Sequence, residues 1–275
     1  MKIHYDVIGD GFPLVFLHAL GTDHRAMQAW SEPVFQQRPG YQRIYVDLPA
    51  HGRSDIGDDA TTSDDLLAGL LDSLDTLLGD RRFALVAKSF GGYMAQGIFH
   101  RKSALIDGLC LLAPALHRTD RALPPHVVLE RDESALSGLE PDAAAAVETL
   151  FVLQTKASIA AFLQEVQPGR LLANRAFLTS EWRTKGYFFS FDPFESDKVY
   201  PQPVLLLLGR QDAICGYQDH LTLLSSFPHA SCSILDRAGH MLEVEQRRTV
   251  QSLFSDWLDR LESFQDSSLE KQPTA

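Results

Sequence analysis

The stretch Leu85–Gly92 constrains the fold of this chain more than any other part of its sequence. It begins with apolar residues suited to a buried strand, turns at Ser89 and continues through two glycines into a helix. Small residues at 87 and 91 around the serine are typical of a nucleophile elbow, in which the serine backbone is strained and its hydroxyl stands above the sheet edge. Taken alone, the stretch is equally consistent with an ordinary strand-to-helix turn capped by serine.

Predicted strands and helices alternate on both sides of this turn. Apolar runs that suit buried strands recur at residues 3–7, 13–18, 43–48, 83–87, 105–113, 204–208 and 232–235. Leucines spaced three and four apart after Ser63 predict a helix that packs on a sheet, and a similar stripe around Trp257 predicts another. The alternation indicates right-handed β–α–β units, and therefore an α/β fold with a mostly parallel central sheet and helices on both faces.

Residues 115–200 interrupt this alternation. They contain an alanine-rich helical run over 141–154, a second helical run over 158–166 and an aromatic cluster over 182–194, but no recognisable parallel strand. The interval is therefore predicted to be a helical insertion that covers the sheet. The predicted division of the chain is a core at 1–114 and 201–262, a helical cap or lid at 115–200 and a disordered tail at 263–275.

Composition excludes several classes of partner. A formal net charge of -11 argues against a phosphate-binding surface, so nucleic acid is not a predicted partner. The amino terminus lacks the pattern of a signal peptide and the apolar runs are too short to cross a membrane, which predicts a cytoplasmic protein without a membrane partner. Cys110, Cys215 and Cys232 show no paired spacing, so neither a disulfide nor a metal site is expected. Oligomeric state is not predictable.

Three polar residues, Ser89, Asp212 and His240, follow predicted strands directly. The loops at the carboxyl ends of parallel strands lie along one sheet edge, so these side chains are expected to converge there. Their order along the chain is the order of a nucleophile elbow completed into a catalytic triad. The alternative acids, which do not follow a strand in the expected place, are Asp192, Asp197 and Asp236.

With the motifs His18–Gly21 and Asp47–Ser54, these loops make the chain resemble the α/β-hydrolase superfamily. The resemblance covers about residues 1–262 except the insertion. It implies that Ser89 is the nucleophile, that His240 is its general base, and that Asp212 is the acid that orients the base. A serine nucleophile weighs against the haloalkane dehalogenase and epoxide hydrolase branches of the superfamily.

The resemblance also suggests the surroundings of the site. It implies an oxyanion hole made by the backbone N–H groups of Leu20 and Phe90. His18 and His51 match positions that brace nearby loops, and Lys88 is expected to point away from the pocket. The predicted pocket residues are His18, Trp182, Tyr187 and Phe188, although the aromatic cluster is equally consistent with a small core of the insertion.

Two alanines depart from the family pattern. Ala19 and Ala50 stand where glycine is usual, and alanine resists positive φ, so the oxyanion loop is expected to be set slightly differently.

The predicted function is that of a carboxylesterase-like serine hydrolase for a small, largely uncharged ester, thioester or lactone, acting through an acyl-enzyme without metal or organic cofactor. One alternative is a carbon–carbon bond hydrolase or lyase that uses the same triad. An alternative of another class is a ligand-binding receptor or pseudoenzyme with negligible turnover. The sequence does not name the substrate, because substrate preference depends on the insertion.

Overall fold

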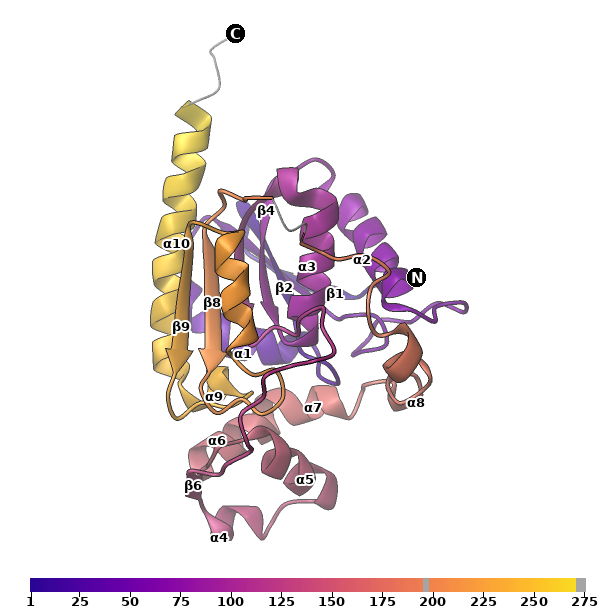
Figure 1. Ribbon diagram of the computed structural model, residues 1–275, viewed down its shortest axis with the longest axis vertical. Helices are drawn as coiled ribbons and strands as arrows, with labels where there is room; N and C mark the ends of the chain where they lie inside the picture. Colours follow the sequence, from indigo (N-terminus) through magenta and orange to yellow (C-terminus); the bar gives the residue numbers. More distant parts are fainter. Residues whose placement is uncertain (195–197, 271–275) are drawn as a thin grey trace.

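The computed structural model describes residues 1–194 and 198–270. Its centre is a seven-stranded sheet with the order β1-β3-β2-β4-β5-β8-β9 (Figure 1). All neighbouring strands pair in parallel except β1, which runs antiparallel to β3. The strands are β1 (Tyr5–Ile8), β2 (Phe12–Leu17), β3 (Tyr41–Val46), β4 (Phe83–Lys88), β5 (Ile106–Leu112), β8 (Val204–Gly209) and β9 (Ala230–Leu235). The predicted α/β fold is confirmed.

Helices cover both faces of this sheet (Figure 1). One face packs against α1 (His24–Phe35) and α10 (Arg247–Glu270) through a cluster that includes Trp30 and Trp257. The other face packs against α2 (Ser63–Leu78) and α3 (Phe90–Lys102). The leucine stripe of α2 is buried at Leu66, Leu67, Leu70, Leu74 and Leu78. Two short 3₁₀ segments are η1 (Ser103–Leu105) and η4 (Asp219–Ser225), and the second buries His220 and Leu223.

The turn from β4 to α3 leaves no room for larger side chains. A Cβ atom at Gly91 would lie 2.4 Å from the carbonyl oxygens of Leu17 and His18 at the end of β2. Backbone atoms cannot move aside as flexible side chains do, so the start of α3 can approach the sheet only because this residue is glycine. The close approach fixes Ser89 at the carboxyl edge of the sheet.

The insertion, residues 115–200, contributes no strand to the central sheet among its described residues. Figure 1 shows α4, α5, α6 and α7 beyond the carboxyl ends of β8 and β9. The elements of the insertion are β6 (Glu130–Arg131), α4 (Glu133–Leu136), α5 (Pro141–Leu150), β7 (Leu153–Gln154), α6 (Lys156–Ala161), η2 (Phe162–Val166), α7 (Gln167–Arg170), α8 (Arg175–Leu178) and η3 (Trp182–Gly186).

Two features of the insertion differ from the sequence prediction. The helix predicted over 141–154 ends at Leu150, and the residues after it form β7. The expected absence of a parallel strand is also wrong, because β6 and β7 pair in parallel over two residues each. The carboxylate of Glu245 accepts hydrogen bonds from the N–H groups of Val152 and Leu153, which holds this segment extended. A contact with a residue so distant in sequence leaves no local pattern.

The carboxyl-terminal helix is longer than predicted. Its buried apolar stripe ends at Leu261, yet α10 continues to Glu270, because no proline or glycine interrupts the residues between. The remainder of the predicted tail, 271–275, lies outside the described residues. No helix in the described part of the chain is long and apolar enough to cross a membrane.

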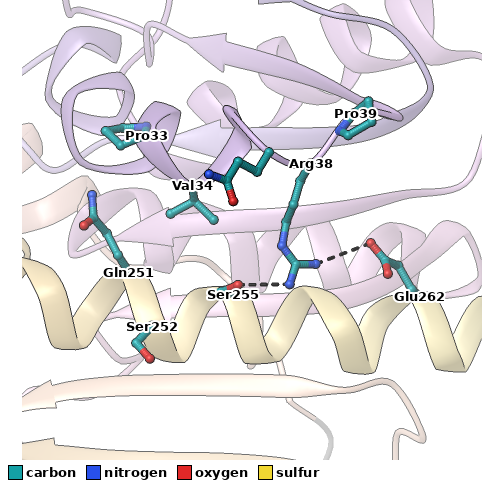
Figure 2. A pocket seen from close by; sticks show the side chains of 9 residues that line it. Pro33, Val34, Arg38, Pro39, Gln251, Ser252, Ser255 and Glu262 are labelled. Carbon is teal, nitrogen blue, oxygen red and sulfur yellow. Dashed lines mark hydrogen bonds and ion pairs between the residues drawn. The ribbon is translucent and has the colours of Figure 1, made fainter.

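A surface cavity of about 720 Å³ lies between the end of α1 and α10 (Figure 2). Arg38 reaches across it, donating to Ser255 Oγ at 3.0 Å and lying 3.6 Å from Glu262 Oε1. Arg38 thereby joins the end of the first helix to the last helix, although the two are far apart in sequence.

Candidate active site

Ser89 occupies a strained position between β4 and α3. Its backbone has φ 51° and ψ -117°, outside the regions that non-glycine residues ordinarily adopt. Such strain persists only where the surrounding structure enforces it, here the close contact of Gly91 with β2. The geometry is that of the nucleophile elbow predicted from the sequence.

His240 connects Ser89 to Asp212. His240 Nε2 lies 2.9 Å from Ser89 Oγ, and His240 Nδ1 lies 2.9 Å from Asp212 Oδ2. The three residues come from loops after β4, β8 and β9, and all three are buried. A proton can therefore pass from the serine hydroxyl to the imidazole while the carboxylate holds the ring in place.

The carboxylate of Asp212 is held by its own loop. Asp212 Oδ1 accepts hydrogen bonds from the N–H groups of Ile214 and Cys215, at 2.8 and 3.0 Å. Burial raises the pKa of this carboxyl group, but His240 and these donors outweigh burial and lower it below its ordinary value. The alternative acids Asp192 and Asp236 are exposed, and Asp197 lies outside the described residues.

The pKa of His240 follows from two opposing effects. Burial disfavours the imidazolium and lowers the pKa, whereas the carboxylate of Asp212 favours it. The attraction to Asp212 prevails, so the pKa of His240 lies above the ordinary value of 6.5. An ion pair between these side chains is therefore stabilised once His240 has accepted a proton.

Leu20 and Phe90, the predicted oxyanion-hole residues, both line the cavity at Ser89. Phe90 is the first residue of α3, so its N–H has no intrahelical carbonyl partner and is available to an oxyanion. The loop that carries Leu20 is fixed at the next residue, where the N–H of Gly21 donates to His51 Nε2 at 2.8 Å.

His18 and His51 brace this loop from behind. His18 Nε2 accepts a hydrogen bond from the N–H of Leu48 at 2.9 Å, and the two imidazole rings pack edge to face. Burial lowers the pKa of both rings, that of His51 to about 3, so both are neutral at pH 7. These contacts suit the bracing role that the sequence suggested.

The two unusual alanines behave differently from each other. Ala50 has φ 67°, a left-handed conformation that costs alanine about 1–2 kcal/mol. Ala19 lies outside that region, so its loop is not strained at this position. Alanine in place of the usual glycine therefore has an energetic cost at position 50. It has no such cost at position 19.

A cavity of about 210 Å³ opens above Ser89 and His240. Of the predicted pocket residues, Tyr187 lines it, while Phe188 lines an adjoining cavity of about 250 Å³. Placing Trp182 in the pocket wall is wrong, because it is 2% exposed and packs edge to face on Phe90 within the core. His18 is likewise fully buried behind the loop rather than in the wall. The aromatic cluster is thus mostly core, with Tyr187 at its cavity side.

Charged side chains in the cavity wall were not anticipated. Lys88, expected to point away, lines the cavity and forms a buried ion pair with Glu243 of α9 (Leu242–Glu245). The wall also contains Cys215 and three arginines, Arg121, Arg170 and Arg183. Lys88 could have been placed in the wall from the sequence, because it is the neighbour of Ser89. The arginines could not, because they lie in the insertion, whose fold the sequence did not reveal.

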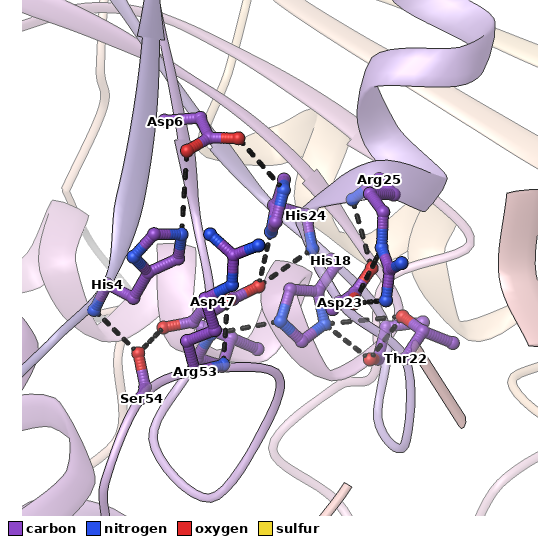
Figure 3. A network of polar contacts seen from close by, with 12 residues as sticks. His4, Asp6, His18, Thr22, Asp23, His24, Arg25, Asp47, Arg53 and Ser54 are labelled. Atoms are coloured by element: carbon purple, nitrogen blue, oxygen red, sulfur yellow. Dashed lines mark hydrogen bonds and ion pairs between the residues drawn. The ribbon is translucent and has the colours of Figure 1, made fainter. Parts of the chain in front are cut away.

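Clusters of possible metal ligands occur elsewhere, and Figure 3 shows the one around His24. His24 Nδ1 donates to Asp47 Oδ1 at 2.7 Å, and its Nε2 lies 3.1 Å from Asp6 Oδ2. Burial lowers the pKa of His24, but these carboxylates outweigh burial and raise it. An imidazole held between two carboxylates accounts for the arrangement, and Asp47 also accepts from the N–H of Arg53. We assign the network to bracing of the loops behind the site.

A family model described as the alpha/beta hydrolase family matches residues 14–251. The chain belongs to this family. Among solved structures, an alpha/beta superfamily hydrolase from Oenococcus oeni PSU-1 has a TM-score of 0.85 and 29% identity, covering 94% of this chain and 96% of that one. The central sheet is thus that of an alpha/beta hydrolase.

Curated alpha/beta hydrolase relatives have several activities. A pimeloyl-[acyl-carrier protein] methyl ester esterase from Legionella pneumophila (strain Corby) is 26% identical over 242 residues, which are 88% of this chain and 92% of the relative. A 2-hydroxymuconate semialdehyde hydrolase from Pseudomonas sp. (strain CF600) is 23% identical over 261 residues, covering 91% of this chain and 88% of the relative. The relatives and the family together identify the chain as an esterase-like hydrolase.

Proposed function

We propose that this chain is a serine hydrolase that cleaves a small ester, thioester or lactone through an acyl-enzyme intermediate. The observation that carries the proposal is the continuous contact from Ser89 through His240 to Asp212, at 2.9 Å for each step, beside a cavity of about 210 Å³. The esterase relative from Legionella pneumophila supports the same reaction class.

In the proposed reaction, Ser89 Oγ attacks the carbonyl carbon and its proton passes to His240 Nε2. The resulting imidazolium is stabilised by Asp212. The N–H groups of Leu20 and Phe90 donate to the oxyanion, and collapse of the tetrahedral intermediate transfers the proton from His240 to the leaving alcohol or thiol. Water then attacks the acyl-enzyme in the same way, which releases the acid and restores Ser89.

The proposal predicts that Ser89→Ala abolishes most hydrolysis. Removing the nucleophile of a triad lowers kcat by about 10⁶-fold in a well-studied serine hydrolase, so we expect activity near background. Release of p-nitrophenol from p-nitrophenyl acetate and butyrate measures this, and a serine-reactive phosphonate should label wild type but not Ser89→Ala. Equal rates for a folded Ser89→Ala variant and wild type would disprove the proposal.

Carbon–carbon bond hydrolysis is the second candidate. The relative that acts on 2-hydroxymuconate semialdehyde favours it, because that compound contains no ester and its hydrolysis breaks a carbon–carbon bond. Activity on a vinylogous diketone without activity on p-nitrophenyl esters would select this alternative. Tight ligand binding with negligible kcat on both substrate types would instead favour a receptor-like protein.

We also propose that the insertion, residues 115–200, is the cap that selects substrates. Residues from it, among them Arg121, Leu150 and Val166, line the same cavity as Ser89. A cap in this position determines which acyl groups reach the nucleophile.

A further inference from the structure

The cavity above Ser89 has an unusually cationic wall for a chain with a net charge of -11. Four cationic side chains line it, namely Lys88, Arg121, Arg170 and Arg183, against the single carboxylate of Glu243 among the described residues. Such a concentration of one charge raises the local concentration of ligands of opposite charge.

Two of the four cations are already committed to acidic partners. Lys88 forms its buried ion pair with Glu243, and both side chains are 4% exposed. Arg170 lies 3.3 Å from Asp142 and donates to Gln167 at 2.9 Å. These pairs contribute little net charge to the cavity.

Arg121 and Arg183 have no carboxylate within ion-pair distance in the part of the chain that the structure describes. Arg121 is held by one contact, in which its Nη1 donates to the carbonyl oxygen of Ile214 at 2.7 Å. Arg183 lies over the ring of Tyr187, 5.0 Å from the ring centroid. Each guanidinium is thus anchored while most of its N–H donors remain available.

The two arginines share the cavity wall with Tyr187. Burial raises the pKa of Tyr187 to about 12, and the positive charges of Arg183 and Arg121 oppose that rise. Arg121, Arg183 and Tyr187 line both the cavity at Ser89 and the adjoining cavity of about 250 Å³. They therefore stand where the cavity at Ser89 meets the adjoining cavity.

We propose that Arg121 and Arg183 form an anion subsite that binds a carboxylate of the substrate. Guanidinium groups bind carboxylates through paired, charge-assisted hydrogen bonds. The substrate would then be a small ester, thioester or lactone that carries a carboxylate on the part bound beside Tyr187, where the two cavities meet. This inference rests on the proposed function and replaces the largely uncharged substrate expected from the sequence.

Matched ester pairs test the subsite. The p-nitrophenyl hemiesters of succinate, glutarate and adipate are compared with neutral p-nitrophenyl esters of equal carbon number. We expect wild type to show a higher kcat/KM for at least one hemiester than for its neutral match. Each substitution removes the charge-assisted hydrogen bonds that one arginine donates to the substrate carboxylate. Arg121→Gln and Arg183→Gln should therefore each lower the hemiester preference about tenfold, mainly through a higher KM for the hemiester. A wild-type preference for every neutral ester would overturn the proposal.

Lys185→Gln is the matched control. Lys185 belongs to the same segment as Arg183, pairs with Glu181 at the surface and loses the same charge on substitution. The hemiester preference should remain that of wild type in Lys185→Gln. An equal loss of preference in this control would mean that net charge, not the subsite, selects the anion, and would refute the proposal.

Binding without turnover separates this inference from the proposed function. In Ser89→Ala, we expect the dicarboxylate that corresponds to the preferred hemiester to raise the melting temperature, and Arg121→Gln in the same background to abolish the increase. Stabilisation with these properties would support the subsite even if the hydrolase assay failed. Hydrolysis without any dicarboxylate binding would uphold the function and reject the subsite.

Discussion

At the scale of single residues, the site depends on a balance between burial and charge at His240. Its imidazole is buried, yet Asp212 stabilises its protonated form enough to raise its pKa above the ordinary value. A general base must be neutral in the free enzyme to accept the proton of Ser89. The proposed reaction should therefore lose activity as the pH falls through the pKa of His240.

We predict that kcat/KM for p-nitrophenyl butyrate rises with pH and reaches half its maximum above pH 6.5. The sign follows because the base is active only above its pKa, which Asp212 raises. In Asp212→Asn, the midpoint should move to lower pH as the residual activity falls by about 10³–10⁴-fold. Initial rates between pH 5 and 10 measure both effects, and a wild-type midpoint at or below 6.5 would contradict the prediction.

The residues that carry the proposed chemistry were more predictable than those that line the cavity. Ser89, Asp212 and His240 follow strands, and the convergence of such loops is a property of parallel sheets. Their geometry is as expected, and their catalytic role stays a prediction. Arg121 and Arg183 could not be located, because the direction of a side chain in an irregular insertion depends on contacts that leave no periodic pattern.

At the scale of elements, the junction between β4 and α3 depends on backbone contact with β2. Gly91 brings the start of α3 against the carbonyl groups of Leu17 and His18. The same contact maintains the positive φ of Ser89. The position of the proposed nucleophile therefore depends on how closely α3 packs against β2.

We predict that Gly91→Ala lowers the free energy of unfolding by about 1–3 kcal/mol, because its Cβ would overlap backbone atoms that cannot relax independently. Activity of the folded fraction should fall as well, since Ser89 would be displaced. Urea unfolding and ester hydrolysis measure the two effects. Gly138→Ala is the control, because a Cβ there meets no atom within 4 Å, and equal stability of the two variants would refute the prediction.

Regular elements were predictable because they repeat a pattern over many residues, as the leucines of α2 do. The two-residue strands β6 and β7 were not, because their conformation is determined by each other and by Glu245. The extension of α10 past Leu261 was missed for a related reason, since a helix can continue beyond the apolar stripe that reveals it.

At the scale of the whole molecule, the first and last helices pack side by side on one face of the sheet. Arg38 joins them across the cavity of Figure 2, contacting Ser255, Asp259 and Glu262 of α10. The acidic side chains of this network are about half exposed, so solvent weakens each ion pair.

We predict that Arg38→Ala lowers the free energy of unfolding by about 1 kcal/mol or less, and the melting temperature by about 2–4 °C. The reason is that exposed ion pairs are weak, although this side chain contacts several partners. Thermal unfolding at low and high salt measures the loss, which should shrink as salt screens the charges. The exposed Arg248→Ala in α10 serves as control, and an equal loss there would show that Arg38 has no special role.

The carboxylate of Glu245 joins the insertion to the loop that carries His240. One oxygen accepts from Val152 and Leu153 of the insertion, and the other accepts from Gly239, the neighbour of His240. Displacing this side of the insertion would therefore pull the base away from Ser89. We expect reactants and products to pass instead on the side of Arg121 and Arg183, so that the same arginines would be the first groups met on arrival and the last left on departure.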